Sequence, residues 1–203
     1  MAQRSGLLRW RVYRDVSGLA ALEFALLSPF LAVLIFGILE LSLRFRAADE
    51  FHRFVQQTGD MLSREEELFS EDLDAVHAAA AQIMKPVSIS GGLEMDVASI
   101  GFTPDGTPEL LWQRARGGPA APFEASQASG LGRPGESVLR VSARFRYTTP
   151  LSDMLSLGAL EMGHAVYYRP RVTRLIAIDG EVHDGGAEWL NDGDSIAATG
   201  DVS

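Results

Sequence analysis

One carboxylate near the start of a long apolar stretch needs a chemical explanation. Glu23 stands directly before an uncharged run that begins at Phe24 and ends at Leu39. A carboxylate in a membrane-spanning helix costs up to about 3 kcal/mol at the bilayer centre and less near an end, so leucine or glutamine would be better tolerated. Glu23 is therefore expected to form an ionic pair with a partner and not to stabilise the helix.

Residue patterns typical of enzymes are absent from this sequence. It contains no Gly-x4-Gly-Lys-Ser/Thr phosphate loop, no His-Glu-x-x-His zinc helix and no Gly-x-Ser-x-Gly nucleophile turn. Cysteine is absent, which excludes disulfides and thiolate metal sites. The acids at 65–67, Asp72 and Asp74 are more typical of the first turns of a solvated helix than of a metal site. We expect no enzymatic activity, no cofactor and no metal.

The apolar stretch predicts a long helix that begins in a membrane. Residues 24–39 would extend about 24 Å, and residues 19–43 are long enough to cross a hydrocarbon core of about 30 Å. Four arginines precede the stretch, which favours a cytoplasmic N-terminus. Apolar residues at three- and four-residue spacing continue the helix to about Thr58, before a break at Gly59 and Asp60.

Three interpretations of the stretch compete. A cleaved secretory signal needs small residues just after the apolar run, but Arg46 stands where a second small residue is wanted. An uncleaved single-span anchor fits the apolar length alone. The third interpretation is a pilin-like precursor that is cleaved before the apolar run, and we favour it on the residues around Gly18.

These residues carry a resemblance to a known family. Gly18 is followed by four residues and then by Glu23-Phe24, a basic leader precedes it, Pro29 lies inside the span, and Gly-Ile-Leu-Glu closes it at 37–40. The pattern resembles the processing site of Flp-type pilins, and over about thirty residues the chain is similar to the TadE-like family of Tad/Flp pilus-assembly pseudopilins.

The resemblance implies a bacterial inner-membrane protein with a cytoplasmic N-terminus, a single span and a periplasmic domain. A prepilin peptidase would cut between Gly18 and Leu19, and Glu23, Phe24, Pro29 and Gly37 would serve assembly and packing. The implied partners are the membrane, the peptidase, other pilins or pseudopilins, and the inner-membrane platform proteins. The alternative function is a single-span anchored periplasmic binding or envelope protein unrelated to pili.

Beyond the span, the sequence predicts an α+β domain with a second helix and a small antiparallel sheet. We divide the chain into a basic leader (1–18), the transmembrane segment (19–43), a periplasmic domain (44–178) and an acidic, disordered tail (179–203). A capping box at 63–66 predicts the start of the second helix, which ends by Pro86. The net charge of −9 argues against a nucleic-acid partner.

The strand predictions come from residue alternation and turn chemistry. We expect strands at 87–90, 93–103, 110–114, 138–147, 165–168 and 172–178, with a turn at 103–107 and a long mobile connection or flap at 117–135. The strand at 138–147 alternates apolar residues with Arg140, Arg144 and Arg146. Those arginines predict a solvated sheet face, with a grip on an acidic partner or lipid headgroups as the less favoured alternative.

Overall fold

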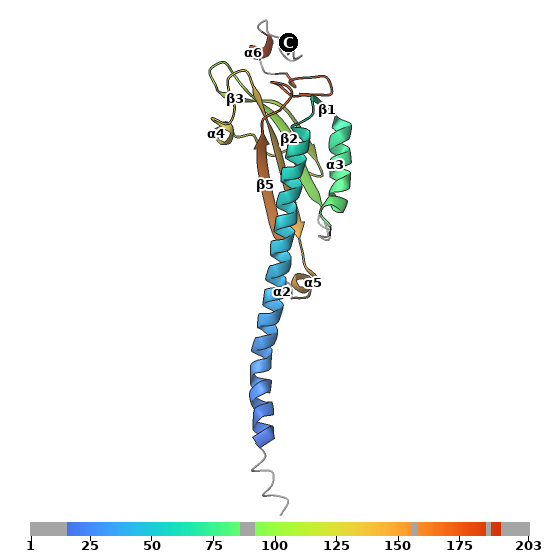
Figure 1. The fold of residues 1–203 in the computed structure, drawn as a ribbon, viewed down its shortest axis with the longest axis vertical. Coiled ribbons are helices and arrows are strands. Elements are labelled where there is room, and N and C mark those ends of the chain that lie inside the picture. The colour runs from blue at the N-terminus through green and yellow to red at the C-terminus, as the bar shows by residue number, and fades with distance from the viewer. Residues whose placement is uncertain (1–15, 86–91, 156–157, 186–187, 192–203) are drawn as a thin grey trace, which may run out of the picture. The chain divides into compact units, whose positions relative to one another are not determined.

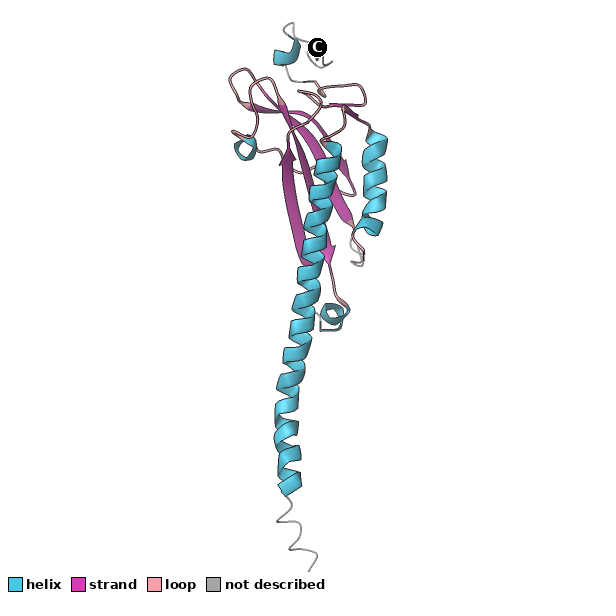
Figure 2. Cartoon of the chain, viewed as in Figure 1, coloured by secondary structure: helices cyan, strands magenta, loops and turns pink. Residues whose placement is uncertain are grey.

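The computed structural model describes residues 16–85, 92–155, 158–185 and 188–191 (Figure 1). The chain divides into two compact units, Met1–Leu43 and Arg44–Ser203. In chain order the elements are α2 (Val16–Leu62), β1 (Glu67–Leu68), α3 (Ser70–Ile83), β2 (Leu93–Phe102), β3 (Pro108–Arg116), α4 (Ala125–Ala128), β4 (Ser137–Tyr147), α5 (Pro150–Leu155), β5 (Leu160–Tyr168), β6 (Ala177–Ile178) and α6 (Glu188–Asn191). Helices and an antiparallel sheet confirm the α+β class (Figure 2).

The main sheet has four strands in the order β3-β2-β4-β5, all antiparallel. One register shift, between Ser99 and Ile100, interrupts the β2–β3 pairing. The turn predicted at 103–107 joins these strands, and Thr103 N–H donates to the Thr107 carbonyl at 3.0 Å. A second sheet consists only of β1 paired in parallel with β6.

The second half of α2 forms part of the core of the domain. Its buried Phe51 packs against Phe145 of β4 with ring centroids 5.0 Å apart. We call this helix-covered side of the sheet the inner face, and the opposite side the outer face. The buried apolar residues of the inner face and of the helices that cover it belong to one cluster: Ala47, Phe51, Phe54, Val55, Leu73, Ala80, Met95, Val97, Val141 and Phe145.

The predicted end of α2 near Thr58 is wrong, because the helix continues through Gly59 to Leu62. A Cβ at Gly59 would lie 2.5 Å from Cε2 of Tyr168 on β5, so this glycine admits the tyrosine ring instead of breaking the helix. Ser63, which the sequence placed at the start of the next helix, closes α2: its N–H donates to the Gly59 carbonyl at 3.0 Å.

The second helix therefore begins later than predicted, at Ser70. Asp72 supports this start, because its carboxylate accepts the Phe69 N–H at 3.2 Å. Asp179, distant in sequence, accepts the Ser70 N–H at 2.9 Å. The acids at this helix end have the structural role expected of carboxylates near a helix N-terminus.

Strand lengths differ from the prediction near the C-terminus. β5 runs from Leu160 to Tyr168 and is more than twice as long as predicted, while only Ala177–Ile178 of the expected strand at 172–178 is a strand. The length of a strand depends on the partner with which it pairs. β5 is longer than predicted because it pairs with β4 from Leu139 to Tyr147. The strand predicted at 87–90 lies outside the described residues.

Candidate functional site

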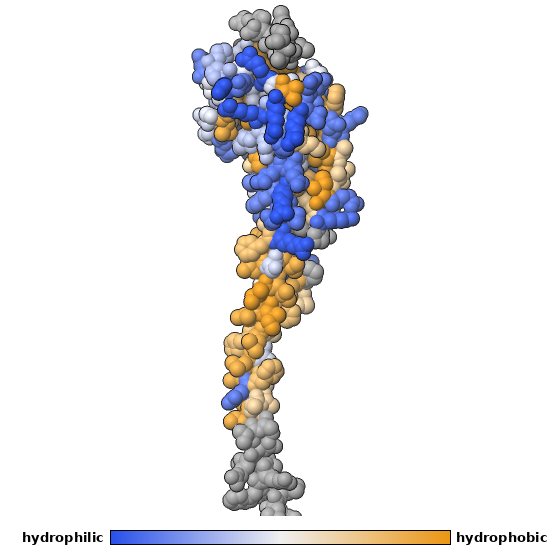
Figure 3. Space-filling view, viewed as in Figure 1, coloured by the Kyte–Doolittle hydropathy of each residue, from blue (hydrophilic) through white to orange (hydrophobic). Residues whose placement is uncertain are grey.

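The N-terminal half of α2 presents a largely apolar surface. An 18-residue window of the helix has a mean hydropathy of 2.3, and none of that window is buried. Figure 3 shows apolar residues gathered over this half of the helix. By length and composition it is the helix in the described part of the chain that can cross a membrane. Its exposed large apolar residues include Leu19, Leu22, Phe24, Leu26, Leu27, Phe30, Leu31, Val33, Leu34, Ile35, Phe36, Ile38 and Leu39.

The predicted processing and pairing residues all lie on this helix. The Gly18–Leu19 bond lies near the start of α2, which begins at Val16. The first turn of a helix has the fewest intrahelical backbone bonds, so it unwinds most readily. Glu23 lies four residues after Leu19, which places both side chains on the same face of the helix, and both are exposed.

Gly18 and Gly37 are not required by contacts within the described chain. A Cβ at either position would meet no heavy atom within 4 Å. Both positions are therefore open to another molecule, and small residues let a second helix or a protease approach the backbone closely. Phe24, predicted to serve packing, is 65% exposed.

Pro29 lies inside α2 without ending it. Proline has no N–H, so the carbonyl of Ala25 loses its usual helical donor. The Ser28 hydroxyl donates to this carbonyl at 3.2 Å. Such replacement matters in lipid, where no water can satisfy a free carbonyl. Sequence reasoning missed Ser28, although a serine beside a proline in an apolar helix is the signal that could have revealed it.

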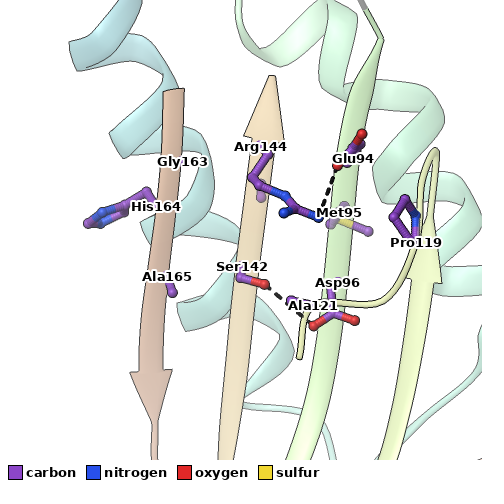
Figure 4. Close-up of a pocket in the computed structure, with 11 residues that line it drawn as sticks. Glu94, Met95, Asp96, Pro119, Ala121, Ser142, Arg144, Gly163, His164 and Ala165 are labelled. Atoms are coloured by element: carbon purple, nitrogen blue, oxygen red, sulfur yellow. Dashed lines mark hydrogen bonds and ion pairs between the residues drawn. The ribbon is translucent and has the colours of Figure 1, made fainter. Parts of the chain in front are cut away.

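A second candidate site is a groove of about 300 Å³ on the outer face of the sheet. Figure 4 shows it between Pro119, in the loop after β3, and Gly163 of β5. Arg144 of β4 pairs there with Glu94 of β2 at 3.1 Å. Ser142 donates to the Asp96 carboxylate at 3.4 Å. Both carboxylates in the groove therefore have hydrogen-bond or ion-pair partners.

Beside the groove lies a buried ion pair. Arg140 donates to the Asp96 carboxylate at 2.9 Å, and the two side chains are only 5% and 6% exposed. Gln113 donates to the same carboxylate at 2.8 Å. The loop after β3 covers the pair, because the carbonyls of Ala121 and Pro122 accept from Arg140.

The predicted arginine face is therefore only partly solvated. Arg144 and Arg146 are exposed, as predicted, and pair with Glu94 and Glu161. Arg140 is buried, so the expectation of a solvated side chain there is wrong. Alternation places a residue on one side of a sheet, but the covering loop decides whether that side meets water.

The segment after β6 has fixed contacts where the sequence predicted a tail. Asp184 accepts from both terminal nitrogens of Arg114, at 2.7 and 2.8 Å. This hydrogen-bonded pairing lowers the pKa of Asp184 and raises that of Arg114. Hydrogen bonds from Ser70 lower the pKa of Asp179. Residues 186–187 and 192–203, which include Asp192 and Asp194, lie outside the described residues, so the boundary of the tail stays a prediction.

Within the described residues, no group of three or more histidine or acidic side chains converges as a metal site would require. Asp74, one of the acids weighed as a metal ligand, pairs with Arg116 instead.

An apolar helix of spanning length followed by an α+β domain defines a class of protein: one that a single N-terminal helix can anchor in a membrane. Residues 18–56 match the family model described as "TadE-like protein". This match confirms the TadE-like resemblance over the segment that contains Gly18, Glu23, Pro29 and Gly37. No curated protein and no solved structure matches the chain.

Proposed function

We propose that this protein is a pseudopilin-like component of a Tad/Flp pilus-assembly system. The observation that carries the proposal is the TadE-like match at residues 18–56, which includes the exposed apolar part of α2. In this proposal the arginine-rich leader stays in the cytoplasm, the apolar helix spans the inner membrane, and the domain from residue 44 lies in the periplasm. Its partners are a prepilin peptidase, other pilins or pseudopilins, and the inner-membrane platform.

The proposed processing step is hydrolysis of the Gly18–Leu19 bond. Gly18 has no side chain to block the peptidase, and the leader holds this bond at the cytoplasmic face. Removal of the leader creates a positively charged amine on Leu19, four residues from Glu23.

We expect protein recovered from membranes that contain the peptidase to begin Leu-Ala-Ala-Leu-Glu when its N-terminus is sequenced. Gly18→Leu should insert but keep its leader, because a side chain there meets no heavy atom of the described chain within 4 Å and would obstruct only the peptidase. Leu22→Ile, an apolar change on the same helix, is the matched control. An intact leader on the unmodified chain would leave only the uncleaved-anchor interpretation.

The proposed role of Glu23 is to pair with the new amine of a neighbouring helix. In lipid a lone carboxylate is costly, whereas a charge pair between helices satisfies both groups and fixes the stagger of one helix against the next. Within one chain, a four-residue offset also allows some contact between the amine and Glu23.

Glu23→Leu should therefore insert and be processed normally, yet fail to co-purify with pilins and abolish piliation. Glu23→Asp keeps the charge and should retain part of both activities, while Gly18→Leu should lose assembly because no amine forms at Leu19. Normal pili with Glu23→Leu would show that the carboxylate is incidental.

The groove on the outer face favours a second candidate function, an anchored periplasmic binding or envelope protein. Arg144 and Glu94 form an ion pair in its lining, beside the small residues Gly163 and Ala165. Processing separates the two candidates, because an anchored binding protein needs neither a cut at Gly18 nor a charge at position 23.

A further inference from the structure

One edge of the main sheet is closed by the chain's own acidic segment. We name residues 179–185, which read Asp-Gly-Glu-Val-His-Asp-Gly, the latch segment. The Asp184 N–H donates to the Leu111 carbonyl of β3 at 2.9 Å, and its carboxylate lies 3.4 Å from the Gln113 N–H. Asp184 thus bonds with the outer edge of β3 through one backbone hydrogen bond and its carboxylate.

Arg114 gives this edge a chemical preference. Both terminal nitrogens of Arg114 donate to the Asp184 carboxylate, in the bidentate geometry that makes arginine–carboxylate pairs strong and directional. The Arg114 side chain is also fixed from behind, because it donates to the Gln113 carbonyl at 3.0 Å. The edge of β3 therefore recognises an extended segment with a carboxylate opposite Arg114.

The latch segment turns sharply where it leaves β6, because Ile178 and Glu181 exchange backbone hydrogen bonds. Asp179, Gly180 and Gly185 have φ values of +52°, +83° and +95°. Positive φ is unfavourable for a residue with a side chain, even for aspartate, which tolerates it better than most. The contacts at Asp184 are polar, and its side chain is 43% exposed.

We propose that the β3 edge is an exchangeable docking site, and that its occupant in an assembly is the latch segment of a second copy of this chain. A second copy carries the matching carboxylate, so the complementarity seen within one chain is available between two. When two protomers exchange an identical segment, the contacts between the chains are the same as those within one chain. This proposal does not depend on the pilus role.

The contact within one chain keeps isolated copies apart. A short tether gives the latch segment an effective concentration in the millimolar range, so a second copy competes only where copies are crowded. A row of anchored copies in one membrane provides such crowding. The latch segment thus binds the β3 edge of its own chain when copies are dispersed, and it binds the β3 edge of a neighbouring copy when copies are crowded in an array.

Two complementary full-length variants test the proposal in membranes. The donor, Arg114→Ala, keeps its latch segment and the backbone contact to Leu111 but has lost the two hydrogen bonds from Arg114 to Asp184. The acceptor, Asp184→Ala, keeps Arg114 but has lost the carboxylate. We expect a tagged acceptor to capture the donor, whereas neither variant captures a second copy of itself.

Controls separate docking from general charge effects. An Arg146→Ala donor loses an exposed arginine on the same sheet but retains its own latch contact, so the acceptor should not capture it. A donor that also carries Asp184→Asn should be captured at least about tenfold less, the loss expected for a charge-assisted bidentate pair.

A direct binding measurement checks the same contact and the folding of the variants. A fluorescent peptide of residues 179–185 should bind the detergent-solubilised acceptor at least about tenfold more tightly than the unmodified chain, whose site is occupied. An acceptor that also carries Arg114→Ala should lose this binding while keeping the circular dichroism of the folded protein. Absence of capture and of peptide binding, or binding that is indifferent to Arg114, would overturn the proposal.

Discussion

Replacing Asp96 by valine should destabilise the folded domain by about 3–5 kcal/mol, because it leaves the charge of Arg140 buried without its counter-ion. The two side chains are 6% and 5% exposed, so water cannot take the place of the carboxylate. The carbonyls of Ala121 and Pro122 remain as acceptors, but they carry no charge. A loss of this size is a large part of the 5–15 kcal/mol by which a domain is usually stable.

The double variant decides whether the charge is the cause. Asp96→Val combined with Arg140→Met removes both charges and keeps apolar volume, and such replacements of buried pairs are often neutral or stabilising. We expect the double variant to lie within about 1–2 kcal/mol of the unmodified protein, although Gln113 loses one acceptor. The single change Arg140→Met should cost less than Asp96→Val, because a carboxylate that keeps Gln113 and Ser142 as donors is better satisfied.

Urea unfolding of the full chain in detergent, followed by tryptophan fluorescence, measures these free energies. Trp112 is a suitable reporter because its indole N–H is buried and donates to the Ile176 carbonyl at 2.8 Å. Because Asp96 and Arg140 are in direct contact, we expect the unfolding free-energy changes of the two single variants not to add up to that of the double variant. If Asp96→Val costs less than about 1 kcal/mol, or if the double variant costs the sum of the singles, the buried-charge explanation is wrong.

Two further predictions concern contacts between α2 and β5. A glycine-to-alanine change inside a helix ordinarily stabilises it by about 0.5–1 kcal/mol. In Gly59→Ala the Tyr168 ring occupies the position of the new Cβ, so we expect a net loss of about 1–2 kcal/mol in stability and a lower Tm. Adding Tyr168→Leu should remove this loss. Burial, and then the nearby charge of His52, lower the pKa of His164, whose ring centroid lies 4.5 Å from that of His52. Stability is therefore complete above the ordinary pKa of histidine and falls as pH drops from there through the lowered value. Urea titrations at about pH 7.5 and pH 5 should show this loss in the unmodified protein and a smaller one in His164→Gln.

The sequence alone determined the features that depend on local residue order. The uncharged run beginning at Phe24 predicts a membrane-spanning helix, and its spacing from Gly18 and Glu23 revealed the family resemblance. The alternation in β4 and the turn at 103–107 also needed no tertiary information, because a period of two and proline–glycine turn chemistry are properties of neighbouring residues.

Only the tertiary structure decided the features that depend on distant partners. Gly59 looked like a helix break, yet a tyrosine more than a hundred residues later packs against it. Arg140 looked solvated like Arg144, but a loop from outside its strand covers it beside Asp96. Asp184 belonged to a segment with too few apolar residues to fold by itself, and it is fixed because β3 presents Arg114 and an open edge. In each case the outcome depends on the energy of a contact between residues far apart in the chain. Local propensity and spacing do not encode such contacts.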